Sequence, residues 1–159
     1  MKAVKFNVIQ DTREQNPWKF TDKCVEKVVS QKLDYGDYAL QGYQNMLWIE
    51  RKGSVSEIAN NMFEERFERL LHNVADYPYK YIICEFSMDD VYNYPYRQGL
   101  PKSVIRKIRV RGKRIMSYLA HVSLEHYINI VYAYNANYAQ HYATSLMKNM
   151  LRVIESTEE

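Results

Sequence analysis

Two carboxylates in this sequence, on a strand and its expected neighbour, are placed to converge with one lysine around a single divalent cation. Asp37 belongs to a Gly-Asp-Tyr turn, and Glu50 and Lys52 end a short apolar segment with the character of a strand. Alternate residues of a strand point to the same face, so Glu50 and Lys52 share a face while Arg51 points to the other. Carboxylates bind hard cations such as Mg²⁺, and an ammonium group can orient water or offset negative charge. The combination indicates phosphodiester hydrolysis.

A Glu-x-Lys triplet alone is also typical of an ordinary solvated strand. The Gly36-Asp37-Tyr38 turn, expected on the neighbouring strand, favours the metal site because it adds a second carboxylate.

Four motifs, in order, resemble the nuclease domain of the XPF/MUS structure-specific endonucleases, a branch of the restriction-endonuclease-like superfamily. The resemblance implies an α/β fold with a mixed central sheet flanked by helices. It also implies a metal-dependent endonuclease that cuts branched or flapped DNA with Mg²⁺, for which Mn²⁺ substitutes. The motifs are Asp11-Thr12-Arg13-Glu14, Gly36-Asp37-Tyr38, Glu50-Arg51-Lys52, and Arg66-Phe67 followed by a strand that ends at Glu85.

The resemblance implies a role for each central residue. Asp37 and Glu50 would bind the metal directly, and Lys52 would position water or stabilise charge. Asp11 and Glu14 would shape an acidic pocket from the end of a neighbouring strand.

The outer motif residues are expected to support this centre. Arg13 would contact a phosphate or hold a carboxylate, and Arg51 would hold an acidic partner or the following helix. Arg66 would lie near the pocket, although a solvated helix position is the alternative. Glu85 ends an apolar strand, where an unpaired carboxylate is costly, so we expect it to pair with an arginine or face the pocket.

One position departs from the family pattern. The family has an aspartate four residues after the lysine, whereas this chain has Ser56 there and Glu57 next. Glu57 replaces the aspartate if the turn carries an extra residue at Gly53. Alternatively, Glu57 is only the partner of Ser54 in an S-x-x-E capping box.

A basic segment follows the motifs. No acidic residue occurs between Val91 and Leu124, and this imbalance favours contact with DNA phosphates, without sequence readout, over a merely solvated surface. In a continuous helix, Lys102, Arg106, Arg109 and Lys113 would share one face. The candidate DNA-binding residues are Lys102, Arg106, Lys107, Arg109, Arg111, Lys113 and Arg114.

With 159 residues, 47% of them apolar, the chain is long enough for one folded domain, which we assign to residues 1–154 with a frayed tail at 155–159. Helix and strand patterns alternate along it. We expect strands at Lys2–Gln10, Lys32–Gln41, Met46–Lys52, Tyr81–Phe86 and Tyr127–Tyr134, and helices at about Thr21–Ser30, Val55–Val74, from Pro101 with a break at Gly112, and from a cap at Asn137 to about Ile154.

Several functional classes are disfavoured. No apolar run suits a membrane helix or a signal peptide, so we expect an intracellular protein without membrane contact. Cys24 and Cys84 lack zinc-site spacing and are expected to be buried and reduced. The histidines show no metalloprotease or Ser-His pattern, and no nucleotide cofactor is expected.

Two alternatives to a catalytic flap endonuclease stay open. The chain could be a non-catalytic DNA-binding subunit that partners an active nuclease, or a Holliday-junction resolvase that acts as a homodimer. DNA repair, recombination and viral genome processing are all compatible with these activities.

Overall fold

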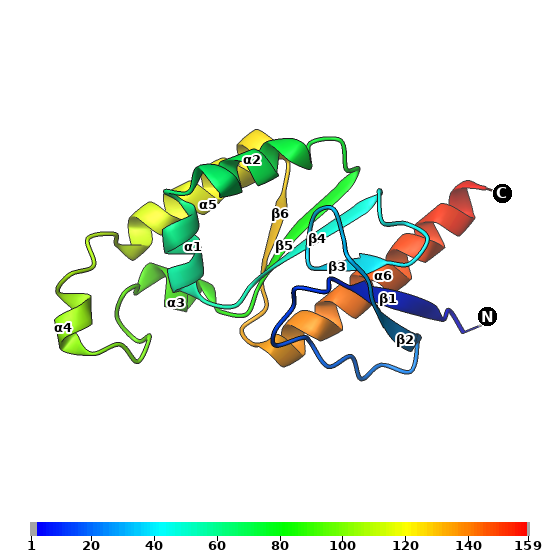
Figure 1. The fold of residues 1–159 in the computed structure, drawn as a ribbon, viewed down its shortest axis with the longest axis horizontal. Helices are drawn as coiled ribbons and strands as arrows, with labels where there is room; N and C mark the ends of the chain where they lie inside the picture. The colour runs from blue at the N-terminus through cyan, green and yellow to red at the C-terminus, as the bar shows by residue number, and fades with distance from the viewer. Residues whose placement is uncertain (1–2, 159) are drawn as a thin grey trace.

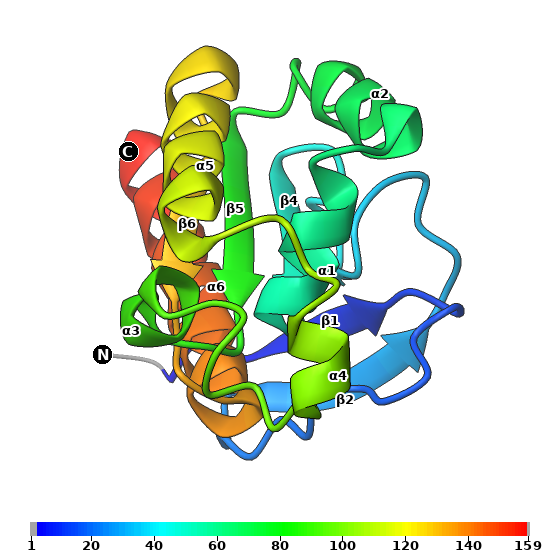
Figure 2. The same ribbon diagram turned by 90° about the vertical axis from the view of Figure 1, so that its left-hand side faces the viewer.

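The computed structural model describes residues 3–158, which form one mixed sheet with helices on both faces (Figures 1 and 2). The strand order is β2-β1-β3-β4-β5-β6. The predicted mixed α/β sheet is therefore confirmed. Its strands are β1 (Phe6–Gln10), β2 (Val25–Ser30), β3 (Tyr38–Leu40), β4 (Leu47–Lys52), β5 (Tyr79–Cys84) and β6 (Asn129–Tyr132).

Strand β3 gives the sheet its mixed character. It runs antiparallel to both β1 and β4, whereas the β1–β2, β4–β5 and β5–β6 pairs are parallel. The turn that precedes β3 therefore lies beside the end of β4. This pairing brings the Gly-Asp-Tyr motif to the Glu-Arg-Lys motif.

Each face of the sheet has its own core. The helices are α1 (Val55–Asn61), α2 (Glu65–Asn73), α3 (Met88–Tyr92), α4 (Lys102–Ile105), α5 (Gly112–His126) and α6 (Ala136–Thr157). On β4, Trp48 packs with residues of α1, α2, α3 and α5, whereas Leu47 and Ile49 pack on the opposite face with residues of α6.

The prediction of a helix at Thr21–Ser30 is wrong. Val25–Ser30 instead forms β2, an edge strand paired in parallel with β1. Its β-branched valines suit an extended backbone, and its pairing partner is distant in sequence, so local periodicity misled the assignment. The strand expected at Lys32–Gln41 is also shorter, with only Tyr38–Leu40 in the sheet.

The helix expected at Val55–Val74 is two helices. After α1 ends, the chain turns through residues 62–64 before α2 begins, with Glu64 in an extended conformation at φ −100°. Both helices still pack apolar residues on the same core, which explains the uninterrupted apolar stripe. The break turns Phe63 outward, where it is 62% exposed.

The basic segment is not one helix either, so the predicted shared face of Lys102, Arg106, Arg109 and Lys113 is wrong. Helix α4 ends at Ile105, and the next helix starts only at Gly112. A Cβ at Gly112 would lie 2.2 Å from the carbonyl oxygens of Val91 and Tyr92. This close approach fixes the start of α5 against α3.

The last helix is longer than expected. Asn135, not Asn137, caps it by accepting a hydrogen bond from the Tyr138 N–H, and α6 continues to Thr157. Part of the segment expected to fray is therefore helical, while Lys2 and Glu159 lie outside the described residues.

Two smaller expectations concern the cysteines and the membrane. Cys24 and Cys84 are buried and free, as predicted. None of the helices within residues 3–158 combines the length and the apolar character needed to cross a bilayer.

Candidate active site

A cleft of about 690 Å³ lies beside the end of β4. The turn before β3 forms one wall, and α1 and α2 contribute the other. The cleft brings together nine of the residues singled out from the sequence: Asp11, Arg13, Glu14, Asp37, Glu50, Arg51, Lys52, Glu57 and Arg66.

Lys52 is the cation at the centre of this cleft. Its Nζ lies 3.5 Å from an oxygen of Glu50 and 3.5 Å from an oxygen of Glu57. The same ammonium lies 4.5 Å from the ring centroid of Phe67, on α2. With its side chain only 4% exposed, Lys52 is held in a defined position between carboxylates and an aromatic face.

The Gly-Asp-Tyr turn is fastened to β4 by main-chain contacts. Gly36 has a φ of +89°, and a Cβ there would lie 2.9 Å from the Ile49 carbonyl oxygen, so the turn requires glycine. The Asp37 N–H donates to that carbonyl at 2.9 Å, and the Arg51 N–H donates to Asp37 Oδ2 at 2.7 Å. Asp37 is thereby fixed next to Glu50.

The two carboxyl groups share a poorly hydrated environment. Burial raises the pKa of Asp37 to about 9, and the negative charge of Glu50 acts in the same direction. Burial also raises the pKa of Glu50, opposed by the positive charge of Lys52. The negative charge of Glu57 adds to the rise at Glu50, so a bound cation would favour the ionised form of both carboxyl groups.

The donor set fits Mg²⁺, although no group of three histidine, cysteine or acidic side chains in residues 3–158 is arranged to hold a metal by itself. Mg²⁺ commonly takes one or two carboxylates and completes its shell with water and substrate phosphate. Asp37 and Glu50 supply two carboxylates whose mutual repulsion a cation would relieve.

Arg51 points to the opposite face of β4, where it holds acidic partners as predicted. Its guanidinium lies 2.9 Å from Glu85 and 3.0 Å from Glu14, and it also donates to the Asn16 carbonyl. The Trp18 indole N–H donates to Glu85 at 2.9 Å. Glu85 is therefore paired, as expected for a carboxylate that is only 9% exposed.

Trp18 was not anticipated from the sequence, yet it closes this network. Its ring stacks on Tyr38 with centroids 4.5 Å apart, and its backbone N–H donates to the Tyr38 hydroxyl at 2.7 Å. The hydroxyl in turn contacts Glu14 at 3.3 Å. The Pro17-Trp18 pair in a polar loop was the available signal, since an isolated tryptophan there needs a packing partner.

Asp11 faces the main chain rather than the centre of the cleft. Its carboxylate accepts hydrogen bonds from the Leu33 N–H at 2.8 Å and from Arg13 Nε at 2.7 Å. Burial alone would raise the pKa of Asp11, but the Arg13 and Leu33 hydrogen bonds outweigh it and lower that pKa. Arg13 thus holds a carboxylate, one of its two expected roles.

Glu57 and Arg66 lie on the helical wall. The Glu57 side chain is 44% exposed and accepts a hydrogen bond from the Gly53 N–H at 3.0 Å. Its own N–H donates to Ser54 Oγ, so half of the predicted capping box is present. Arg66 is exposed and lines the cleft.

The basic segment lies outside the cleft. None of its seven candidate residues is among those that line it. Figure 1 places α4 at one end of the molecule, beyond α1 and α3. The basic segment and the cleft are therefore separate surfaces.

The chain was compared with protein families, curated sequences and solved structures. No protein-family model and no curated protein sequence matches the chain. Among solved structures, XPF from Aeropyrum pernix superimposes with a TM-score of 0.65 at 19% identity, covering 96% of this chain and 68% of that one. The same protein in complex with DNA gives a TM-score of 0.65 at 20% identity, covering 93% and 66% of the two chains.

This chain has the XPF-type nuclease fold. The likeness to XPF covers almost the whole chain, including the part after Phe86 where the sequence motifs end. It also spans only about two thirds of the XPF chains. At this level of identity the likeness establishes the fold, and the chemistry must be argued from the cleft.

The buried carboxylate pair makes a testable prediction about stability. We expect Asp37→Asn to stabilise the metal-free protein by about 1–3 kcal/mol at pH 8, because the Asp37 carboxyl is ionised in the unfolded chain and must take up a proton, or carry its charge next to Glu50, when the chain folds. A folded-state pKa raised to about 9 means that wild-type Asp37 stabilises the fold in acid and loses this contribution as the pH rises. The gain should therefore vanish near pH 4.

Urea unfolding of both proteins in chelator at pH 4, 6 and 8 measures this difference. Glu26→Gln, on the exposed edge strand β2, is the control and should change little at any pH. A gain that does not grow with pH would contradict the analysis.

The Arg51 network makes a second prediction. Arg51→Met should destabilise the protein by about 3–5 kcal/mol, because two carboxylates that are 15% and 9% exposed lose their cation. Arg69→Met removes a surface pair with Glu65 that is 67% and 94% exposed, and it should cost less than about 1 kcal/mol. Equal unfolding free energies for the two variants would rule out a supporting role for Arg51.

Proposed function

We propose that this protein is a metal-dependent DNA endonuclease that hydrolyses phosphodiester bonds in branched or flapped DNA. The observation that carries the proposal is the pair of carboxylates, Asp37 and Glu50, next to the sequestered ammonium of Lys52 in an open cleft. The XPF structure solved in complex with DNA supports a nucleic acid as the ligand.

Asp37, Glu50 and Lys52 each have a defined part in the proposed reaction. Asp37 and Glu50 would hold Mg²⁺, or Mn²⁺ in its place, which supplies charge neutralisation at the phosphate and acidifies water. Lys52 Nζ, 3.5 Å from Glu50, can donate hydrogen bonds to a water molecule or to a phosphate oxygen. Its contact with the Phe67 ring limits the directions in which it can donate.

The rim of the cleft carries cations suited to the DNA backbone. Arg66 and Arg69 both line the cleft from α2 and are exposed. Their guanidinium groups can contact phosphates on either side of the bond to be cut. The basic segment at Lys102–Arg114 would continue this contact along the duplex and set its salt dependence.

The alternative of a non-catalytic subunit is less well supported. Such a subunit has no need to retain two poorly hydrated carboxylates, which cost folding free energy, or a lysine sequestered beside them. A homodimeric junction resolvase would use the same cleft in two copies and would differ by making paired, symmetric cuts.

Cleavage assays test the proposal. Glu50→Gln and Lys52→Met should each lower the cleavage rate by about 10³-fold or more, while DNA affinity measured in chelator changes little. The substrates are flap, fork, four-way-junction and single-stranded DNAs, with Mg²⁺ or with chelator. Glu26→Gln on β2 should cut like the wild type. Wild-type rates in either cleft variant, or cutting in chelator, would refute the assignment.

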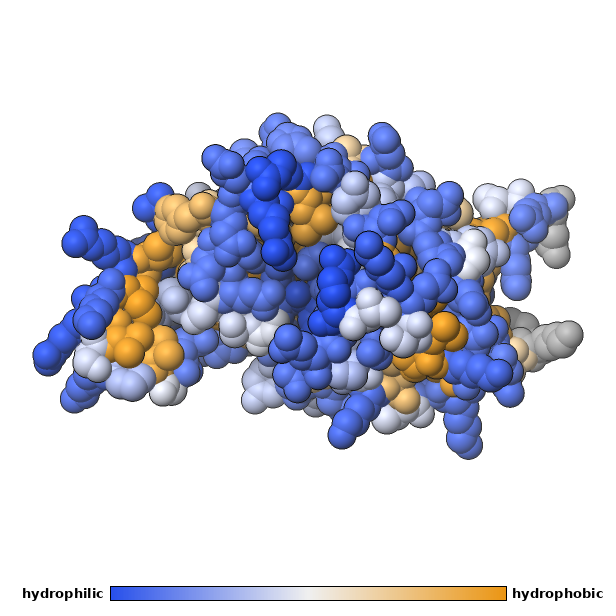
Figure 3. Space-filling view, in the orientation of Figure 1, coloured by the Kyte–Doolittle hydropathy of each residue, from blue (hydrophilic) through white to orange (hydrophobic). Residues whose placement is uncertain are grey.

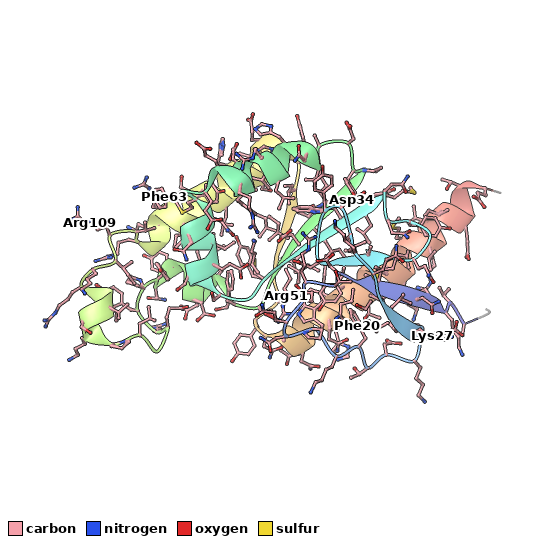
Figure 4. All side chains as sticks on the ribbon, in the orientation of Figure 1. Phe20, Lys27, Asp34, Arg51, Phe63 and Arg109 are labelled. Atoms are coloured by element: carbon pink, nitrogen blue, oxygen red, sulfur yellow. The ribbon has the colours of Figure 1, made fainter. Side chains whose placement is uncertain are left out.

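The basic segment gives a prediction of its own. With about five phosphate contacts, log K should fall with log salt concentration at a slope of about −4 to −5. Combining Lys102→Ala, Arg106→Ala and Arg109→Ala should reduce that slope by about 2–3. Lys27→Ala, on β2 at the other side of the molecule from Arg109, should leave it unchanged (Figure 4). A wild-type slope near zero would remove the segment from the DNA-binding surface.

A further inference from the structure

Phe63 is an exposed aromatic residue at the rim of the cleft. It lies in the turn between α1 and α2, and it is 62% exposed although the residues on both sides of this turn contribute to the core. The next residue, Glu64, lines the cleft. A single exposed ring is common on protein surfaces, so the side chains around Phe63 decide whether it has a role.

An arginine from a different helix accompanies this ring. The Arg114 guanidinium, in the first turn of α5, lies 5.5 Å from the Phe63 ring centroid. Through this contact the cleft rim joins the basic segment that ends at α5. Phe63 therefore lies where the cleft and the basic segment meet, as Figure 4 shows for Phe63 and Arg109.

The surface around this junction is apolar at its centre and basic at its borders. Val104 is 41% exposed on α4, and Ile105 and Ile108 are partly exposed beside it. Figure 3 shows this hydrophobic surface over α4, with hydrophilic side chains around it. Within residues 3–158, none of the seven basic residues from Lys102 to Arg114 forms an ion pair.

We propose that Phe63 is a stacking platform for an unpaired base at the branch point of the DNA, a role that rests on the proposed nuclease function. All four bases can stack on an aromatic ring, and arginines around such a ring can bind the adjacent phosphates. A DNA end or branch offers both a free base face and a dense negative charge, which matches an aromatic ring bordered by unpaired cations. A plain duplex offers the charge without the free face.

The proposal predicts a loss of structure preference rather than of DNA binding. In chelator, Phe63→Ala should bind a forked DNA about 5- to 100-fold more weakly, the range expected for the loss of one stacked base. Its affinity for a blunt duplex of equal length should stay within about twofold, because the phosphate contacts remain. Phe63→Trp should retain or increase the preference for the fork.

A fluorescent base provides a direct readout. With 2-aminopurine as the first unpaired base of the fork, stacking on Phe63 should quench its fluorescence in the wild type and in Phe63→Trp, but not in Phe63→Ala. Tyr127→Ala is the matched control, since Tyr127 is 84% exposed at the opposite end of α5. It should behave as the wild type in both measurements.

Several outcomes separate this inference from the proposed function. If Phe63→Ala keeps the wild-type ratio of fork to duplex affinity, the platform is wrong even though the protein binds and cuts DNA. If Phe63→Ala instead changes the molecular mass measured by light scattering without changing that ratio, the ring serves contact between copies of the chain, which also overturns the inference. Failure of the wild type to bind or cut any DNA would overturn the proposed function itself.

Discussion

Arg51 lies on β4 between Glu50 and Lys52, and its side chain joins separate segments at the side of the cleft, on the opposite face of β4. The guanidinium binds Glu14 and the Asn16 carbonyl in the loop after β1 and Glu85 just after β5. Its backbone N–H holds Asp37 from the turn before β3. Because alternate residues of a strand face opposite ways, one tripeptide presents Glu50 and Lys52 to the cleft and anchors the strand from behind. The rest of the site depends on this anchor.

The anchor is needed because the cleft itself is costly to fold. Burial raises the pKa of both Asp37 and Glu50; the charge of Glu50 adds to the rise at Asp37, and the charge of Glu57 adds to the rise at Glu50. Lys52 offsets part of this repulsion but is shared with Glu57. The Trp18–Tyr38 stack and the Glu85–Arg51 pair lie on the other face of the same strands and supply compensating contacts. A cation and a phosphate would complete the charge balance that the folded chain leaves open.

The sequence predicted the site better than it predicted the helices. The central residues lie in short motifs whose geometry follows from strand alternation and one antiparallel pairing, so their convergence could be inferred locally. The edge strand β2 could not be inferred in this way, because its pairing with β1 is non-local and its valines also fit the apolar stripe of a helix. The break at residues 62–64 was hidden because α1 and α2 pack on the same core. Trp18 was missed because its partners, Tyr38 and Glu85, are distant in sequence.

The turn after β4 places the Glu57 carboxylate in the cleft. The Gly53 N–H donates to Glu57 Oε2, and a Cβ at Gly53 would approach Glu85 Oε2 to 3.3 Å. A small residue there lets the turn pass close to the carboxylates of Glu57 and Glu85 while α1 still begins with Ser54 as its cap. The Glu57 side chain bonds to Gly53 and Lys52 rather than back to the cap, so its backbone serves the helix while its carboxylate serves the cleft. The capping contact of the Glu57 backbone therefore does not prevent its carboxylate from facing the cleft, so the two roles considered for Glu57 do not exclude each other.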